Sequence, residues 1–544
     1  MKNFRRIVLV CLMLVLFSFG SMAYERSETL VYGGGLWETP SNWNPLTPWS
    51  AVTGTGGIVY ESLFHFYPMT GEYQPWLASS GKWLSNNTYE IELRKGIKWT
   101  DGQAFDAEDV KFTFEIAKKN PLHYSNVWDW IKEIKIINPH KLQFVFKNPH
   151  YQEWEIIIYD QMIIPEHIWS KIPASELLTT ANKNPVGTGA YLTELVGQDR
   201  MVWVRNENWW GNGVFGKPQP KYLVNLVVYE NNVALGMLMK SELDLSNYFI
   251  PGVPKIKNIF GLTTWYKGSP YMLPENTALL FLNSTKGAMK DVKFRRALAF
   301  AINPAMITNK VFEDQVEVAN PTGLFSKDWM NFYSEEAVKE YGFSYNPQKA
   351  KEMLDAAGYK DTNKDGWREQ PNGEPMKFEI IVPNGWTDWM ESIKIIADNF
   401  KAVGVNAIAS FPDYSIYYDK LQNGTFDMAI NNFGSAQSAT PFTYWNWVAN
   451  DEIDGEMVTD GNWGRYKDKE LFRLIDDFNV LKSEDPSAKK AAGEIQKKLL
   501  QEMPSIPLWY NGLWAQSTST YWTNWPTEDN PVGYPCTWGG KWWL

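Results

Sequence analysis

The sequence predicts a globular protein of two or three domains in which strands and helices both occur. A chain of 544 residues exceeds what one hydrophobic core usually holds, so it is expected to divide. Apolar residues make up 44% and charged residues 21% of the chain, as in an ordinary folded protein. Both hydrophobic periodicities are present: residues 87–93 alternate as in a strand, and residues 107–117 repeat as in a helix.

The first element with clear chemistry is the stretch 93–118, which predicts a turn followed by an amphipathic helix. Asp101 and Gly102 interrupt an extended run. Asp106 is suited to cap a helix that has Asp109 at its third position. One face of that helix would carry Val110, Phe114 and Ala117. All of these roles are structural, so the stretch is not expected to carry catalysis.

Three later elements have recognisable limits. Asn346 is expected to cap a helix that begins at Pro347 and is ended by Gly358. A strand is expected over residues 376–382. A late helix repeats small and aliphatic residues on one face, namely Ala488, Ala491, Ala492, Ile495 and Leu499.

The stretch 93–113 reads LRKGIKWTDGQAFDAEDVKFT, and many of its residues stand at the fixed spacings of a known signature. The matching positions are Leu93, Arg94, Gly96, Trp99, Asp101, Gly102, Phe105, Ala107, Asp109, Val110, Phe112 and Thr113. The stretch closely resembles the signature of the family 5 extracellular solute-binding proteins. Members of that family are the receptors of oligopeptide, nickel and oligosaccharide ABC importers.

Further segments resemble the same family and extend the likeness over nearly the whole chain. They are NPVGTGAY at 184–191, the helix over 291–302, the helix over 346–358 and MPSIPL at 503–508. The resemblance implies an α/β, two-lobed periplasmic-binding-protein fold with a hinged cleft and an extra inserted domain. On that pattern the three domains would be domain I (24–57, 186–277 and 515–544), domain II (58–185) and domain III (278–514).

The N-terminus has the three parts of a secretory signal peptide over residues 1–23. Lys2, Arg5 and Arg6 precede an apolar run at 7–19, and the small residues Ser21 and Ala23 follow. The alternative, a membrane anchor, is disfavoured because the run is shorter than the roughly 20 residues that span a bilayer. We therefore expect a periplasmic or extracytoplasmic protein that begins at Tyr24.

Charge and cysteine content exclude several classes of protein. A net charge of −10 argues against nucleic acid or an anionic membrane surface as partner, because both favour basic patches. Cys11 falls inside the apolar run, which leaves Cys536 alone in the mature chain. No disulfide is therefore expected, and stability should come from packing.

Catalysis has little support in the sequence, and no catalytic residue is predicted. The five histidines all lie in the first third of the chain without metal-ligand spacing, and there is no H-E-x-x-H or G-x-S-x-G motif. A secreted glycoside-active enzyme stays an alternative, since two suitably spaced carboxylates cannot be recognised from sequence.

One loop has the spacing of the first half of a calcium site. Asp361, Asn363 and Asp365 match that spacing, but Asn372 stands where a bidentate Glu is required. Glu369 or Glu374 would have to supply an oxygen in its place. A loop of side-chain-capped turns is the favoured interpretation, and we expect no metal and no cofactor.

Aromatic residues are the anomaly of the composition, with 28 Trp, 27 Tyr and 28 Phe. Sugar rings present apolar faces that stack on indoles, and their hydroxyls need amide and acid partners. Mixtures of Trp with Asn and Glu are therefore candidate sugar-binding residues, although any single Trp is more often a packing residue. The predicted ligand-binding residues are Trp37, Glu38, Asn384, Trp386, Trp389, Asn432, Trp445, Trp509 and Trp514.

The resemblance leaves the class of ligand to be decided. Peptide receptors of the family hold the peptide's amino group with an Asp, but the corresponding stretch at 434–441 contains no acid. An unpaired buried ammonium would be costly, and nickel is disfavoured because histidine is scarce. The sequence therefore predicts a monomeric receptor that binds a short oligosaccharide and delivers it to an ABC permease. An oligopeptide receptor is the main alternative, and a purely structural surface protein is a third.

Overall fold

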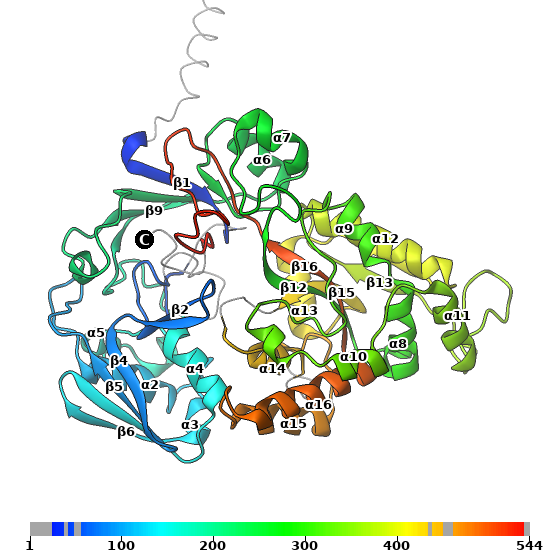
Figure 1. Ribbon diagram of the computed structural model, residues 1–544, viewed down its shortest axis with the longest axis horizontal. Coiled ribbons are helices and arrows are strands. Elements are labelled where there is room, and N and C mark those ends of the chain that lie inside the picture. The colour runs from blue at the N-terminus through cyan, green and yellow to red at the C-terminus, as the bar shows by residue number, and fades with distance from the viewer. Residues whose placement is uncertain are drawn as a thin grey trace, which may run out of the picture.

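The computed structural model describes residues 24–36, 42–47, 56–433, 438–449, 458 and 461–537. Figure 1 shows two lobes side by side: the first half of the chain forms the left lobe, and most of the second half forms the right one. Of the predicted site residues, Trp37 and Glu38 fall outside the described residues, as does the predicted signal peptide. Within the described part, no helix is both long and apolar enough to cross a bilayer.

A six-stranded sheet forms the upper part of the first lobe, and it is built from three separate stretches of the chain. Its order is β17-β11-β1-β10-β9-β8. The strands are β1 (Thr29–Gly33), β8 (Tyr191–Val196), β9 (Arg200–Arg205), β10 (Tyr222–Leu226), β11 (Leu245–Ser246) and β17 (Gln516–Ser517). β1 runs parallel to both β10 and β11, whereas β9, β8 and β17 pair in the antiparallel sense.

The residues between β1 and β8 form a second sheet and a hairpin. The four-stranded sheet has the order β4-β5-β7-β6, with β2 and β3 paired separately. These strands are β2 (Phe64–Tyr67), β3 (Glu72–Pro75), β4 (Ala78–Ser85), β5 (Thr88–Leu93), β6 (Ile131–Asn138) and β7 (Lys141–Phe146). The accompanying helices are α2 (Ala107–Ala117), α3 (Val127–Trp130), α4 (Tyr151–Asp160) and α5 (Glu166–Trp169). β5 confirms the predicted strand, and its alternate residues are buried.

Helix α2 begins as the sequence predicts. The Asp106 side chain caps the backbone of the first turn, and the Asp109 carboxylate accepts a hydrogen bond from the Asp106 N–H at 3.1 Å. Asp109 also accepts bonds from the Trp99 indole at 3.1 Å and from the Glu166 N–H at 2.9 Å. The signature stretch is therefore a buried capping network that ties α2 to α5, which confirms its structural role.

Glycine is required where the chain returns to the six-stranded sheet. A side chain on Gly187 would lie 1.9 Å from the Val59 carbonyl oxygen, and one on Gly189 would lie 2.1 Å from that of Ile58. Only glycine permits such a close approach of two backbones. The predicted turn at 184–191 is thus a tight backbone junction.

A buried carboxylate holds the two parts of the first lobe together. Glu61 accepts hydrogen bonds from the indole N–H groups of Trp76 at 2.7 Å, Trp209 at 3.2 Å and Trp210 at 2.8 Å. Glu61 and Trp76 belong to the segment inserted after β1, whereas Trp209 and Trp210 follow β9. Part of the aromatic excess is therefore explained by hydrogen-bonded packing inside this lobe.

The second lobe is built on a five-stranded sheet of order β14-β13-β15-β12-β16. Its strands are β12 (Leu273–Leu282), β13 (Phe378–Ile381), β14 (Ala407–Ser410), β15 (Met428–Phe433) and β16 (Ser505–Leu513). The helices of this half are α8 (Val292–Ala301), α9 (Pro304–Lys310), α10 (Glu335–Tyr341), α11 (Pro347–Ala356), α12 (Thr387–Ala402), α13 (Tyr414–Asn423), α14 (Phe442–Val448), α15 (Lys469–Asn479) and α16 (Pro486–Glu502).

Two predicted helices of this lobe are confirmed in detail. In α11 the Asn346 side chain accepts from the backbone N–H of Lys349, and Pro347 is the first helical residue. In α16 the buried positions include Ala488, Ala492 and Ile495. Short 3₁₀ helices occur at η1 (Arg26–Glu28), η2 (Ala174–Glu176), η3 (Trp210–Gly213), η4 (Gly287–Lys290) and η5 (Trp329–Phe332).

Within the described residues, the chain crosses between the lobes at two points, which lie side by side. β16 belongs to the second-lobe sheet and β17 to the first-lobe sheet, so one crossing follows Leu513. The other precedes β12, where Thr263 and Ser517 exchange backbone hydrogen bonds of 2.9 and 3.0 Å. β12 begins at Leu273, ahead of the predicted domain limit at residue 278. The first-lobe helices α6 (Asn231–Met239) and α7 (Val253–Phe260) lie beside these crossings (Figure 1).

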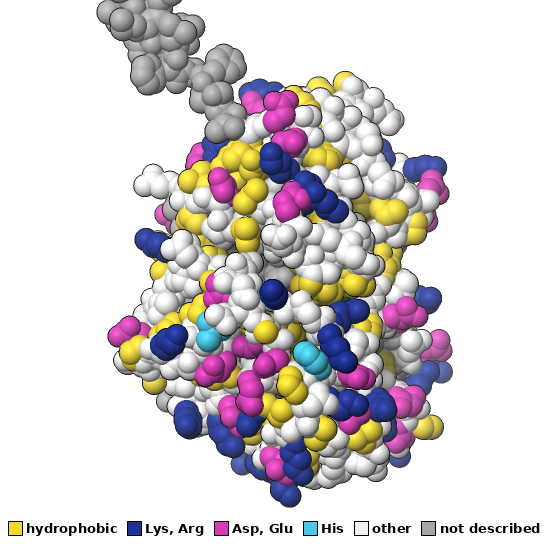
Figure 2. Space-filling view, turned by 90° about the vertical axis from the view of Figure 1, so that its left-hand side faces the viewer, with side chains coloured by type: hydrophobic (Ala, Val, Ile, Leu, Met, Phe, Trp, Pro, Cys, Tyr) yellow, Lys and Arg dark blue, Asp and Glu magenta, His cyan; other side chains and the backbone are white. Residues whose placement is uncertain are grey.

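Charges are spread over the surface of the first lobe. Figure 2 shows the left-hand face of Figure 1, where basic and acidic side chains are interspersed and acidic ones gather in the lower half. On the face drawn, basic side chains do not merge into the continuous patch that nucleic-acid binding favours.

Candidate ligand-binding site

The edge of the five-stranded sheet where β13, β14 and β15 end is the candidate site. β13 pairs in parallel with β14 and with β15, so the three strands end at the same edge. In open sheets with parallel strands, ligands bind outside the carboxyl ends of those strands. The residues that follow these three strands are therefore the first to consider.

Asn384 and Trp386 lie in the turn that follows β13. Asn384 is exposed, and its backbone N–H donates to the Pro412 carbonyl at 2.9 Å, which ties this turn to the one after β14. Trp386 is half-buried and immediately precedes α12. Asn432, also half-buried, stands at the end of β15, where its N–H donates to the Asn431 side chain at 2.8 Å. The structure thus brings three of the predicted residues to one edge of one sheet.

A row of aromatic rings extends from Trp386 along α13. Trp386 lies 5.9 Å from Tyr414, and Tyr414 stacks on Tyr418 at 6.1 Å with an interplanar angle of 12°. All three residues are half-buried. Tyr414 and Tyr418 were missed by the sequence analysis, although their i, i+4 spacing after a strand is the signal that could have found them.

The other four predicted tryptophans are packing residues in this arrangement. Their exposed fractions are 3% for Trp389, 0% for Trp445, 0% for Trp509 and 7% for Trp514. Phe312 contacts both Trp509 at 5.1 Å and Trp514 at 5.9 Å between ring centroids. A ligand could stack on these four indoles only after their present neighbours had moved. Burying large aromatic side chains removes apolar surface from water, which is the physical reason for their position.

A buried carboxyl group supports the start of α12 below Trp386. Oδ1 of Asp388 accepts a hydrogen bond from Nδ2 of Asn231, the first residue of α6, at 3.1 Å. Burial raises the pKa of Asp388 to about 7, and its hydrogen bonds lower it only in part. Because it is buried, Asp388 positions the turn that carries Trp386 and does not itself face a ligand.

The first lobe presents a second group of aromatic and acidic side chains toward the other lobe. On β3 and α4, the rings of Tyr73 and Tyr159 lie 5.8 Å apart, and the Tyr73 hydroxyl lies 3.5 Å from Glu155 Oε2. Burial raises the pKa of Glu155 to about 7, and the negative charge of Glu484 in the second lobe adds to the shift. The two lobes therefore approach each other at α4. Sequence analysis missed this group, because its members become neighbours only in the fold.

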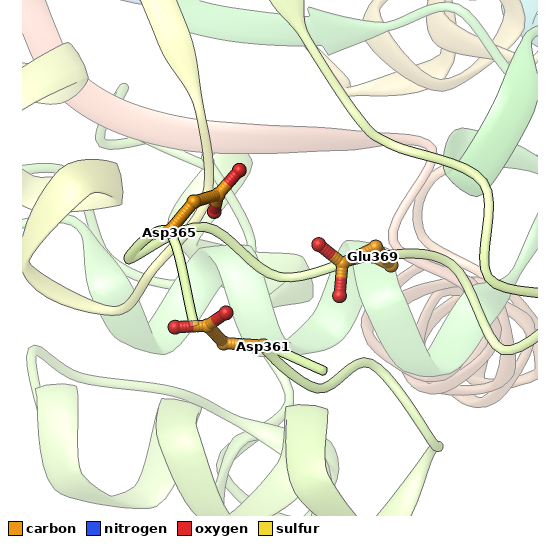
Figure 3. Close-up of side chains that lie close together, drawn as sticks. All are labelled: Asp361, Asp365 and Glu369. Carbon is orange, nitrogen blue, oxygen red and sulfur yellow. The ribbon is translucent and has the colours of Figure 1, made fainter. Parts of the chain in front are cut away.

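The predicted calcium loop forms a small cluster of carboxylates (Figure 3). One oxygen from each of Asp361, Asp365 and Glu369 can be chosen so that all three lie within 4.8 Å of one another. Asn363 bonds to Asp365 twice: its Oδ1 accepts from the Asp365 N–H at 2.8 Å, and its Nδ2 donates to Asp365 Oδ2 at 3.1 Å. Glu369 Oε2 accepts from the N–H and the hydroxyl of Thr362, both at 2.7 Å. These hydrogen bonds are the side-chain-capped turns of the favoured interpretation.

Comparison with known proteins places the chain in a family. The family model described as "Bacterial extracellular solute-binding proteins, family 5 Middle" matches residues 72–455. The oligopeptide-binding protein AppA of Bacillus subtilis is 23% identical over 446 residues, covering 80% of this chain and 77% of its own length. The nickel-binding periplasmic protein of Escherichia coli is 25% identical over 406 residues, covering 72% of this chain and 74% of its own.

One solved structure is much more similar. A periplasmic oligopeptide-binding protein of an ABC transporter from Thermotoga maritima, crystallised with mannohexaose bound, is 47% identical in sequence. The likeness covers 96% of this chain and 97% of the other, with a TM-score of 0.92.

Proposed function

Since the chain belongs to the family 5 bacterial extracellular solute-binding proteins, we propose that its ligand is a short oligosaccharide held between the two lobes. As a solute-binding receptor of an ABC importer, the protein is not an enzyme. Family members of this kind deliver their ligand to a membrane permease. The resemblance predicted from the signature stretch is thereby confirmed at the level of the family.

The observation that carries the proposal is the likeness to the mannohexaose-bound protein of Thermotoga maritima. At 47% identity over nearly the full length, that protein is far more similar to this chain than the peptide receptor AppA at 23%. Although the Thermotoga protein is named as an oligopeptide-binding protein, the ligand bound in its crystal is the sugar mannohexaose. An oligopeptide receptor stays the alternative.

The row of rings on the second lobe suits a sugar chain. In the proposed site, apolar sugar faces stack on the half-buried aromatic residues Trp386, Tyr414 and Tyr418. Asn384 and Asn432 supply amide groups for hydroxyls at the same edge. The other predicted residues of the proposed site are Trp37 and Glu38 in the first lobe, and Trp389, Trp445, Trp509 and Trp514 in the second.

Closure of the lobes would bury the sugar. A ligand shifts the equilibrium between open and closed lobes only by its greater affinity for the closed arrangement.

We also propose the predicted domain limits, cleavage of the signal peptide before Tyr24, an extracytoplasmic location and a monomeric state. The membership of β17 and β16 in different sheets supports a crossing near residue 515.

Thermal unfolding against a panel of ligands tests the proposal. We expect mannohexaose or a related oligosaccharide, at 100 times its dissociation constant, to add about 2.7 kcal/mol to the free energy of unfolding. A mixed pool of di- to pentapeptides serves as the comparison and is expected to give no shift. A shift with peptides alone would overturn the sugar assignment and establish the oligopeptide alternative.

A further inference from the structure

The two lobes touch at a polar contact between α4 and the segment that joins α15 to α16. Helix α4 belongs to the first lobe, where Trp154 and Ile158 are part of its buried cluster. Helix α15 belongs to the second lobe, where Ile475 and Phe478 are part of another cluster. Figure 1 shows this contact at the bottom of the molecule, far from the strands by which the chain crosses between the lobes.

Gln152 supplies one half of the contact. Its Nε2 donates to the Leu481 carbonyl at 2.7 Å and lies 3.3 Å from the Ser483 hydroxyl. The side chain comes from the first turn of α4, and only 1% of the residue is exposed. A buried amide with partners on the opposite lobe would lose those partners when the lobes separate.

Asn479, the last residue of α15, supplies the other half. Its Oδ1 accepts from the Glu153 backbone N–H at 3.1 Å, and its Nδ2 lies 3.3 Å from Glu153 Oε2 and 3.1 Å from His150 Nδ1. The residue is 3% exposed. One side chain therefore satisfies backbone and side-chain groups at the start of α4, where N–H groups lack helical partners.

Around the hydrogen bonds of Gln152 and Asn479, some contacts hold the two lobes together and one repels them. Ile156 of α4 packs against the second-lobe cluster, and the Lys482 ammonium lies 5.2 Å from the centre of the Tyr151 ring. In the opposite sense, the charge of Glu484 raises the pKa of Glu155, so two acidic groups face each other across the contact. Because the attractive and repulsive contributions to the free energy of this contact are small and oppose each other, the lobes can separate here and come together again readily.

We propose that Asn479 and Gln152 form a latch that favours the closed arrangement of the lobes by its own contacts, in addition to what a ligand supplies. The inference rests on the proposed closure of the lobes, because a contact far from the crossings is the one that rotation about them separates. Buried amides that are paired across the boundary when closed, and hydrated when open, bias this equilibrium.

The closed population can be measured by single-molecule energy transfer. Lys119→Cys and Lys490→Cys place dyes on exposed positions of the two lobes, and Cys536 is buried. We expect the protein to populate a short dye distance without added ligand, and Asn479→Ala to lower the closed-to-open ratio about tenfold. Asn479→Asp, which keeps the size but sets a carboxylate against Glu153, should lower it at least as far.

Asn423→Ala is the matched control. Asn423 is likewise the last residue of its helix, but its amide bonds within α13, to the backbone and side-chain oxygens of Asp419 at 3.1 and 2.9 Å. The distribution of dye-to-dye distances in the Asn423→Ala variant should equal that of the parent protein. Equal distributions for the parent and both Asn479 variants, or a parent with no short-distance population, would overturn the latch.

A titration with mannohexaose separates the latch from the proposed function. If the sugar binds, Asn479→Ala should weaken its affinity wherever the unliganded protein is mostly open, since the closed fraction limits binding. If mannohexaose does not bind, the ligand assignment fails, while the ligand-free distance distributions still decide the latch.

Discussion

Two of the places where the described parts of the lobes meet differ in chemistry, one beside the chain crossings and one at α4. Beside the crossings, one buried apolar cluster includes Val228 and Leu238 of the first lobe together with Trp389 and Ile393 of the second. At α4 the contact includes amide hydrogen bonds that join the two lobes. Exposing apolar surface costs about 25 cal/mol per Å², whereas hydrogen bonds can be exchanged for bonds to water at a net cost of about 1 kcal/mol each. The first contact is therefore suited to stay and the second to separate.

Removing an indole from the apolar contact beside the chain crossings, here called the permanent contact, should have the largest effect on stability. Trp389→Ala is expected to lower the free energy of unfolding by about 3 to 5 kcal/mol, because it leaves a cavity in the shared cluster. Urea unfolding followed by circular dichroism measures the loss. A loss below about 1 kcal/mol would mean that this side of the boundary is not the rigid one.

The buried Asp388 should make the permanent contact sensitive to pH. Because its pKa is raised to about 7, the folded protein keeps a proton that the unfolded chain releases above the ordinary pKa of Asp. The stability that this proton contributes is present at low pH and is lost as the pH rises toward about 7.

Asp388→Asn should remove the loss of stability that accompanies a rise in pH toward about 7. We expect the variant to gain up to about 3 kcal/mol relative to the parent between about pH 5 and about pH 8, as measured by urea unfolding at both values. Asn can still accept the bond from Asn231. An identical pH dependence in both proteins would show that Asp388 titrates normally.

Trp386 lies at the same boundary but is half-buried, so its loss should act on binding more than on folding. Trp386→Ala is expected to weaken oligosaccharide binding by about 1 to 3 kcal/mol if its indole stacks on the sugar. Isothermal titration with mannohexaose gives the affinity, and unfolding of the same sample gives the stability. An unchanged affinity would remove Trp386 from the proposed site.

Much of the fold was predictable because its signals are local. Asp106 and Asp109 stand three residues apart and cap α2 within a single turn, and Asn346 with Pro347 starts α11 in the same way. Their partners are fixed by sequence spacing, whatever the rest of the chain does. The family resemblance extended these local signals to the two-lobed fold.

The candidate site was only partly predictable. Asn384, Trp386 and Asn432 reach the sheet edge, since each follows or ends a strand whose position the fold fixes. Tyr414 and Tyr418 were overlooked, because weight was given to Trp and not to the i, i+4 spacing that aligns two rings. Glu61, Gln152 and Asn479 carried no local signal at all.

By itself, the sequence determined the local elements and the family. Only the tertiary structure decided which tryptophans are covered, since Trp509 is buried by Phe312, a residue nearly two hundred positions away in the chain. Burial is a property of contacts between distant segments, and composition records only how many aromatic rings are available. The same reason holds for the contact between Gln152 and Leu481, whose partners lie on different lobes.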